Sequence, residues 1–229
     1  MRNVARGKGW PRAVVFDLDG TLVDSAPDIA ASLNEVLGWR DLAPFPLADV
    51  RRMIGGGIRL LITRALEAHG VATDDVQPVV DDMLRVYAGR ATELTVLFEG
   101  AEDTLRDLRG AGVKLAVCTN KVQHITDIIL RDLDIAQYFA SVVGARPDLP
   151  RKPDPAMLHC ALAMMEIGAA EAVMVGDSSA DSGAAQAAGM PVILAEFGYA
   201  PGGIAALAPD AIFAHFADLP AVLASLRTL

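Results

Sequence analysis

Two aspartates lie two positions apart where an apolar segment of the chain ends. Residues 13–16 predict a buried strand, and Asp17-Leu18-Asp19-Gly20-Thr21 follows at once. Residues two apart along a strand point the same way, so the two carboxylates lie side by side, and Gly20 lets the backbone turn away. Such a pair repels unless a cation or a shared proton intervenes. The sequence therefore predicts a metal site, and a nucleophile with its acid/base partner, at Asp17 and Asp19.

Two structural explanations compete with that interpretation. A calcium loop counted from Asp17 needs an oxygen ligand at position five, Gly at six and Glu at twelve, with a helix before it. Those positions hold Thr21, Leu22 and Asp28, and a strand precedes them, which excludes such a loop. A plain polar turn remains an alternative.

Polar residues also occur at two later breaks in the apolar pattern. Thr119 and Asn120 close the segment 114–120, and with the free N–H groups of a following helix they could bind an anion, although helix capping explains them equally well. Lys152 is held at a helix entrance by Pro153 and an Asp-Pro pair, although a lone lysine is more often a solvated surface cation.

A third break carries acids again. Asp177 ends the segment 172–177, and Asp181 follows one helical turn later. Asp177 can face the same cleft as Asp17 and Asp19. Asp181 could equally serve, in part, as a cap of the next helix.

The elements that must position these residues alternate between strand and helix from residue 114 onward. This alternation predicts a parallel sheet with helices on both faces, and ligands of such sheets bind at the carboxyl ends of the strands. The expected strands are 13–16, 114–120, 141–144, 172–177, 191–197 and 211–214. The expected helices are 100–111, 121–133, 154–167, 180–188 and 217–226.

Residues 24–90 interrupt the alternation. Amphipathic helices are expected at 26–39, 57–69 and 75–87, with no strand among them. We therefore predict an all-helical cap of residues 24–90 and an α/β core of residues 1–23 and 91–229. An insert that leaves and re-enters beside a site is well placed to cover it as a lid. The alternative is an appendage that only stabilises the fold.

Composition narrows the class of protein. The 229 residues are 52% apolar and 21% charged, enough for a substantial core. A net charge of −9 argues against a general nucleic-acid binder. Cys118 and Cys160 have no metal-like spacing, and buried thiols in a reducing compartment are expected. No segment approaches the ~20 apolar residues of a membrane span. We expect a cytoplasmic protein without a membrane partner.

The motifs in this order resemble those of the haloacid dehalogenase (HAD) superfamily of phosphotransferases. The resemblance covers the chain from about residue 12, and residues 16–25 and 151–155 are similar to the phosphoglycolate phosphatase branch. It implies a Rossmann-like parallel sheet with a small helical cap inserted after the first strand. The motif positions are Asp17 with Asp19, Thr119, Lys152, and Asp177 with Asp181.

The resemblance also implies a mechanism. Mg²⁺ would be bound by Asp17, Asp177 and the backbone carbonyl of Asp19. Asp17 would attack a phosphate monoester in line and form an aspartyl phosphate. Asp19 would protonate the leaving alcohol and then take the proton from the hydrolytic water.

Further residues would hold the phosphoryl group during transfer. Thr119 and Lys152, with Asn120 beside them, would bind its oxygens, where charge is greatest in the transition state. Asp181 would orient metal-bound waters or Lys152.

The cap would select the substrate. Arg51, Arg52 and Arg59, with Gly56 in the loop 54–57, are the candidates, because an arginine fork would suit a carboxylate such as that of glycolate. Solvent-facing helix cations are an equal alternative. The chain departs from the branch at residues 144–146, which read Gly-Ala-Arg where Gly-Gly-Asp is common.

We therefore expect a Mg²⁺-dependent phosphatase acting on a small phosphorylated metabolite, phosphoglycolate first. One alternative is a sugar phosphomutase, or a sugar-phosphate or pyrophosphate phosphatase of the same family. A non-enzymatic alternative is a phospho-accepting receiver, but chain order and the helical insert count against it. Monomer and homodimer both remain open.

Overall fold

The computed structural model describes residues 9–199 and 203–226. Six parallel strands form one sheet in the order β5-β4-β1-β6-β7-β8. The strands are β1 Ala13–Phe16, β4 Lys114–Val122, β5 Ser141–Ala145, β6 Ala172–Gly176, β7 Val192–Ala195 and β8 Ala211–Phe213. The predicted α/β fold with a parallel sheet is confirmed.

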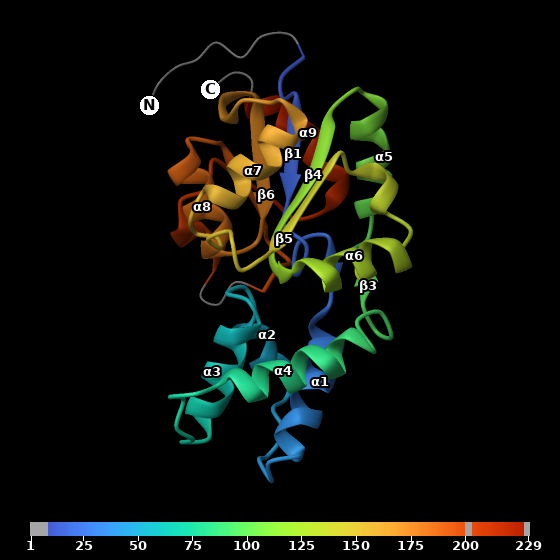
Figure 1. Ribbon diagram of the computed structural model, residues 1–229. Coiled ribbons are helices and arrows are strands. Elements are labelled where there is room, and N and C mark those ends of the chain that lie inside the picture. Colours follow the sequence, from blue (N-terminus) through green and yellow to red (C-terminus); the bar gives the residue numbers. More distant parts are fainter. Residues whose placement is uncertain (1–8, 200–202, 227–229) are drawn as a thin grey trace.

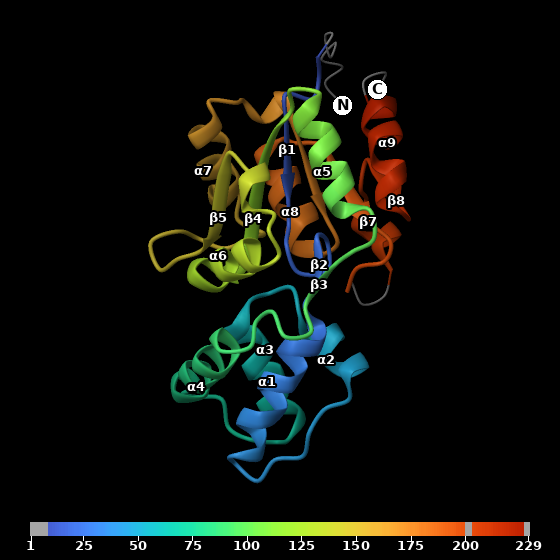
Figure 2. The same ribbon diagram turned by 90° about the vertical axis from the view of Figure 1, so that its right-hand side faces the viewer.

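Helices cover both faces of this sheet (Figures 1 and 2). Alternate residues of β1 divide between the two faces: Val14 and Phe16 pack with α5, α6 and α9, whereas Ala13 and Val15 pack with α7 and α8. Both faces are buried, which explains why the strands read as continuous apolar runs. The helices are α5 Ala101–Gly110, α6 Gln123–Asp132, α7 Ala156–Met165, α8 Ser179–Ala188 and α9 Leu219–Ser225.

Four helices between β1 and α5 lie together beyond one end of the sheet (Figure 2). The sequence did not predict α2, because its seven residues bury only Val50 and follow two prolines, so they show no helical period. The domain boundaries stay a prediction, and the first eight and last three residues assigned to the core lie outside the described residues. The four helices are α1 Ala26–Gly38, α2 Leu47–Met53, α3 Ile58–Ala68 and α4 Gln77–Ala88.

A small antiparallel pair joins the two connections between sheet and cap. β2 Val23–Asp24 pairs with β3 Val96–Leu97, a pair that is too short for its pattern to be detected in sequence. Among the described helices, none combines the length and the apolar character needed to cross a membrane.

One predicted boundary is wrong in a way that matters for the site. Residue 121 was expected to open a helix, but β4 runs through Val122 and α6 begins at Gln123. The register between β4 and β5 shifts between Cys118 and Val122, as in a β-bulge, and Val122 still pairs with Ala145. Lys121 therefore belongs to the end of a strand.

A buried carboxylate fixes the return of the chain from the cap. Asp28, fully buried in the first turn of α1, accepts hydrogen bonds from the Leu94 and Thr95 N–H groups and from the Thr95 hydroxyl, at 2.7–3.0 Å. These bonds hold the segment before β3 against α1.

We predict that Asp28→Ala lowers the free energy of unfolding by roughly 2–4 kcal/mol, because it leaves buried donors unpaired. Urea denaturation measures the change. The control is Asp74→Ala, at an exposed cap position, whose free energy of unfolding should lie within ~0.5 kcal/mol of that of the unaltered protein. An Asp28→Ala protein as stable as the control would show that the bonds to residues 94 and 95 contribute nothing net.

Candidate active site

Two acids extend from the carboxyl ends of neighbouring central strands. Phe16 pairs with Val175, so the residues after β1 and β6 emerge level, and the Asp17 N–H donates to the Val175 carbonyl at 2.9 Å. Gly20 turns with φ of 81°, and a Cβ there would collide with the Asp177 carboxylate. Glycine therefore lets the turn after β1 lie directly against the second acid.

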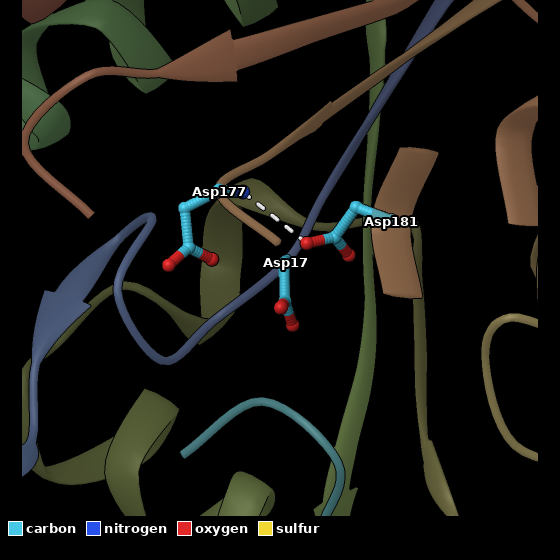
Figure 3. Close-up of side chains that lie close together, drawn as sticks. All are labelled: Asp17, Asp177 and Asp181. Carbon is cyan, nitrogen blue, oxygen red and sulfur yellow. Dashed lines mark hydrogen bonds between the residues drawn. The ribbon is translucent and has the colours of Figure 1, made fainter. Parts of the chain in front are cut away.

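Asp17, Asp177 and Asp181 form one buried cluster (Figure 3). Each offers a carboxylate oxygen, and these oxygens lie within 4.8 Å of one another. Burial, and then the charge of Asp181, raises the pKa of Asp17 to about 7, and the same causes raise the pKa of Asp177 well above its usual range. Oxygen ligands this close fit a hard divalent cation, which would favour their ionised forms.

Within this cluster, Asp181 is already committed to hydrogen bonds. Its Oδ1 accepts from Lys152 Nζ at 2.6 Å. Its Oδ2 accepts from the Asp177 and Ser178 N–H groups and from the Ser178 hydroxyl, which caps α8. The arrangement suits a residue that orients Lys152 and the Asp177 loop better than one that binds a metal.

Lys152 has an acceptor for each of its ammonium protons. Its Nζ donates to the Cys118 carbonyl and to Asp181, both at 2.6 Å, and pairs with Asp17 Oδ1 at 3.1 Å. Burial alone would lower the pKa of Lys152, but the charges of Asp17 and Asp181 outweigh it and raise that pKa. Within the described residues Asp17 Oδ2 accepts no hydrogen bond, so this oxygen is free to attack or to bind a cation.

Asp19 lies beside the acid cluster, not in it. Its Oδ1 accepts from Lys121 Nζ at 2.6 Å and from the Ser25 hydroxyl, and within the described chain no donor meets Oδ2. The carboxylate is thus held in place with one oxygen open, which suits the predicted acid/base role. Metal binding by the Asp19 carbonyl stays a prediction.

Thr119 and Asn120 meet the cluster from β4. The Thr119 oxygen accepts from the Lys121 N–H at 3.3 Å, which leaves its own proton to donate. The Asn120 amide donates to the carbonyls of Lys152, at 2.9 Å, and of Gly55, at 3.2 Å. Asn120 therefore connects Lys152 to the cap loop, and its side-chain nitrogen is occupied in doing so.

The glycine loop of the cap lies directly on the core. Gly57 has φ of 85°, and a Cβ there would come within 3.2 Å of the Asn120 carbonyl. Gly55 and Gly57 both line the cavity above Asp17. Gly56, between them, faces its own helix, because a Cβ there would collide with Leu60.

The cap arginines do not line that cavity. Arg51 forms an ion pair with Asp24 at 2.6 Å, and exposed Arg59 hydrogen-bonds to Gln77 on α4. Arg52 is exposed as well. The structure thus places Arg59 away from the substrate position expected from the sequence, because α3 directs its side chain toward the neighbouring cap helix.

The departure at residues 144–146 also falls outside the cavity. Arg146 lies 3.7 Å from Asp148, and its Nη2 contacts the Cys160 sulfur. This substitution therefore does not alter the residues that face Asp17.

Tyr199 is a site residue that the sequence did not reveal. Its N–H donates to Asp177 at 2.7 Å, and its hydroxyl donates to Asp24 at 2.6 Å while accepting from the Ser25 and Ala26 N–H groups. One residue, through its backbone N–H and its hydroxyl, thus connects the acid cluster to the start of the cap. No sequence pattern signals contacts between residues so far apart in the chain.

The cavity between sheet and cap is small, about 60 Å³, and mostly apolar. The polar side chains of the lining come mainly from the core, whereas the cap contributes hydrophobic residues, the loop glycines and Tyr87. Its lining residues are Asp17, Asp19, Ile29, Ile54, Gly55, Gly57, Ile58, Leu61, Met83, Tyr87, Thr119, Asn120, Lys121, Val122 and Ile125.

Known proteins are similar to this chain in sequence and in fold. Residues 14–195 match the model of the haloacid dehalogenase-like hydrolase family. A phosphoglycolate phosphatase of Caulobacter vibrioides is 37% identical over 94% of this chain and 92% of its own, and one of Rhodospirillum rubrum is 40% identical over 91% and 89%. The crystal structure of a predicted phosphoglycolate phosphatase from Haemophilus somnus superposes with a TM-score of 0.86, at 30% identity over 92% of this chain and 97% of that one.

The family matches well over half of the chain, and the relatives match almost all of it. The family and the enzyme class that the sequence predicts, a phosphoric monoester hydrolase, are therefore confirmed. This chain belongs to the haloacid dehalogenase-like hydrolase family.

Proposed function

We propose that this protein is a Mg²⁺-dependent phosphatase that hydrolyses phosphoglycolate through an aspartyl phosphate on Asp17. The observation that carries the proposal is the setting of Asp17. Asp17 lines a small cavity, one of its carboxylate oxygens is paired with buried Lys152, and the other accepts no hydrogen bond from the described residues. A carboxylate so placed is a nucleophile for an anionic ester whose charge is offset nearby.

The acid cluster fits the metal. Asp17 and Asp177 would hold Mg²⁺, and the carbonyl of Asp19 is a further candidate. When bound, the ion offsets the repulsion between these carboxylates and the phosphate. The hydroxyl of Thr119 would bind a phosphoryl oxygen from the core side, and Lys152 would bind another by turning the proton of its longest contact, the 3.1 Å one to Asp17, toward the substrate.

The protein's own groups account for both chemical steps. Asp17 attacks phosphorus as the bond to the leaving oxygen breaks, and Asp19 gives that oxygen a proton. Asp19 then takes a proton from water, which hydrolyses the aspartyl phosphate and frees Asp17.

The cap wall argues for a small substrate. Ile29, Leu61 and Met83 make this wall mainly apolar, and among the described cap residues that line the cavity only Tyr87 carries a polar side-chain group. Most hydroxyl groups of a sugar would therefore be buried there without hydrogen-bond partners. This disfavours a sugar phosphomutase. The relatives named phosphoglycolate phosphatase support the smaller ester.

We predict that phosphate release from phosphoglycolate exceeds release from hexose and pentose phosphates by roughly 100-fold or more in kcat/KM, because an unpaired buried hydroxyl is costly. A panel of phosphate monoesters with Mg²⁺ present measures this. A sugar phosphate isomerised without phosphate release would support the mutase instead.

We predict that Asp17→Asn lowers kcat by roughly 10⁴-fold or more, because the amide cannot form the aspartyl phosphate. Far-UV circular dichroism should be unchanged, since Lys152 retains Asp181. Most of the activity surviving in this variant would rule out Asp17 as the nucleophile.

We predict that Mg²⁺ raises the melting temperature. At a Mg²⁺ concentration a hundred times the dissociation constant, binding should add about 2.7 kcal/mol to the free energy of unfolding. Between pH 3.8 and about 7, folded Asp17 holds a proton that the unfolded chain has lost, so metal-free stability falls as pH rises. Protons and metal compete for the same oxygens, so the Mg²⁺ shift should grow over this range. Thermal unfolding at several pH values measures it.

Two variants control the metal experiment. Asp177→Asn should remove the Mg²⁺ shift, whereas Asp74→Asn, exposed on the cap, should keep it. A full shift in the Asp177→Asn protein would place the metal elsewhere.

A further inference from the structure

Lys121 is a buried cation to which the proposed mechanism gives no role beyond holding Asp19. Its side chain is 4% exposed, lines the cavity, and lies with Nζ 4.6 Å from the centre of the Tyr87 ring. Because β4 extends through Val122, the lysine leaves the end of a strand toward the cap. It is the only cationic side chain among the described residues that line the cavity.

The two buried lysines differ in how their protons are used. Lys152 has three acceptors, at 2.6, 2.6 and 3.1 Å. Lys121 has one, Asp19 Oδ1, among the described residues, and otherwise only the face of Tyr87. An ammonium group has three donors, and burying them unfilled is costly. Lys121 is therefore prepared to receive an additional anionic group.

The position of Lys121 indicates where that group lies on the substrate. Its Nζ is one hydrogen bond, 2.6 Å, from Asp19, which delivers the proton to the leaving oxygen in the proposed mechanism. A group bonded to the carbon next to that oxygen would therefore come close to Nζ. The cap arginines expected to bind a carboxylate lie outside the cavity, so they do not compete for this role.

We propose that Lys121 binds the carboxylate of the substrate and thereby selects phosphate esters that carry a carboxylate on the carbon next to the ester oxygen. This rests on the proposed phosphatase function. It assigns the choice of substrate to a residue of the core, with the Tyr87 ring of the cap closing over the ammonium group.

The test compares two esters that differ at one group. 2-Phosphoglycolate carries the carboxylate, and 2-hydroxyethyl phosphate replaces it with a neutral alcohol of similar size. The variants are Lys121→Met, which keeps the apolar stem, Lys121→Arg, which keeps the charge, and Lys114→Met, an exposed lysine at the far end of the same strand.

We expect the unaltered enzyme to prefer 2-phosphoglycolate in kcat/KM, and Lys121→Met to reduce that preference by roughly 10- to 100-fold, mainly through KM, as expected for a lost charged hydrogen bond. Lys121→Arg should restore part of the preference, and Lys114→Met should leave it unchanged. Melting temperatures identify any variant that fails to fold.

Three results would overturn the inference. Equal losses on both esters in Lys121→Met would mean that the lysine acts only by positioning Asp19. An unaltered enzyme without preference would mean that no carboxylate is recognised. Calorimetric binding of 2-phosphoglycolate to the Asp17→Asn protein, unaffected by adding Lys121→Met, would exclude the contact without requiring turnover. A different result would contradict the proposed function and leave the role of Lys121 intact: neither ester releases phosphate, but binding of 2-phosphoglycolate still depends on Lys121.

Discussion

The structure depends on gathering three buried carboxylates at one point of a sheet. Asp17, Asp177 and Asp181 repel one another, and burial adds to the cost of their charges. Two features offset this within the protein. Lys152 is held between two of the acids, and Asp181 is satisfied by the N-terminus of α8. Asp17 and Asp177 carry the negative charge that these two features do not offset. A divalent cation would complement that charge.

Topology explains why these groups meet. β1 lies between β4 and β6, so the residues after its end are flanked by Thr119 on one side and Asp177 on the other. The chain enters the cap directly from β1, which brings Ser25 onto Asp19. Tyr199, which follows β7, fixes that same connection while it holds Asp177. The same residues therefore hold the start of the cap and orient the acids.

The sequence predicted most of the fold because its signals are local. Apolar runs ending in Asp17, Thr119 and Asp177 identify strand ends, and strand ends of a parallel sheet share one edge. What it missed depends on contacts distant in the chain. Tyr199 belongs to no sequence motif. The sequence predicts a helix from Lys121 because its local pattern does not show that β4 continues beside β5 as far as Val122. Likewise, the sequence around Arg59 could not show that this side chain forms a hydrogen bond to Gln77 within the cap.

In the proposed function, the reaction and the choice of substrate depend on different residues. In the proposed mechanism the phosphoryl group contacts Lys152, Thr119 and the acids, none of which would distinguish one ester from another. The cap adds apolar side chains, and these exclude groups that need hydrogen bonds instead of attracting a particular one. Recognition then falls to a single cation with unfilled donors, Lys121, because in apolar surroundings one charge discriminates more strongly than it would in water. A cap wall that is mainly apolar is therefore compatible with a selective enzyme, because in this proposal the core supplies the cation.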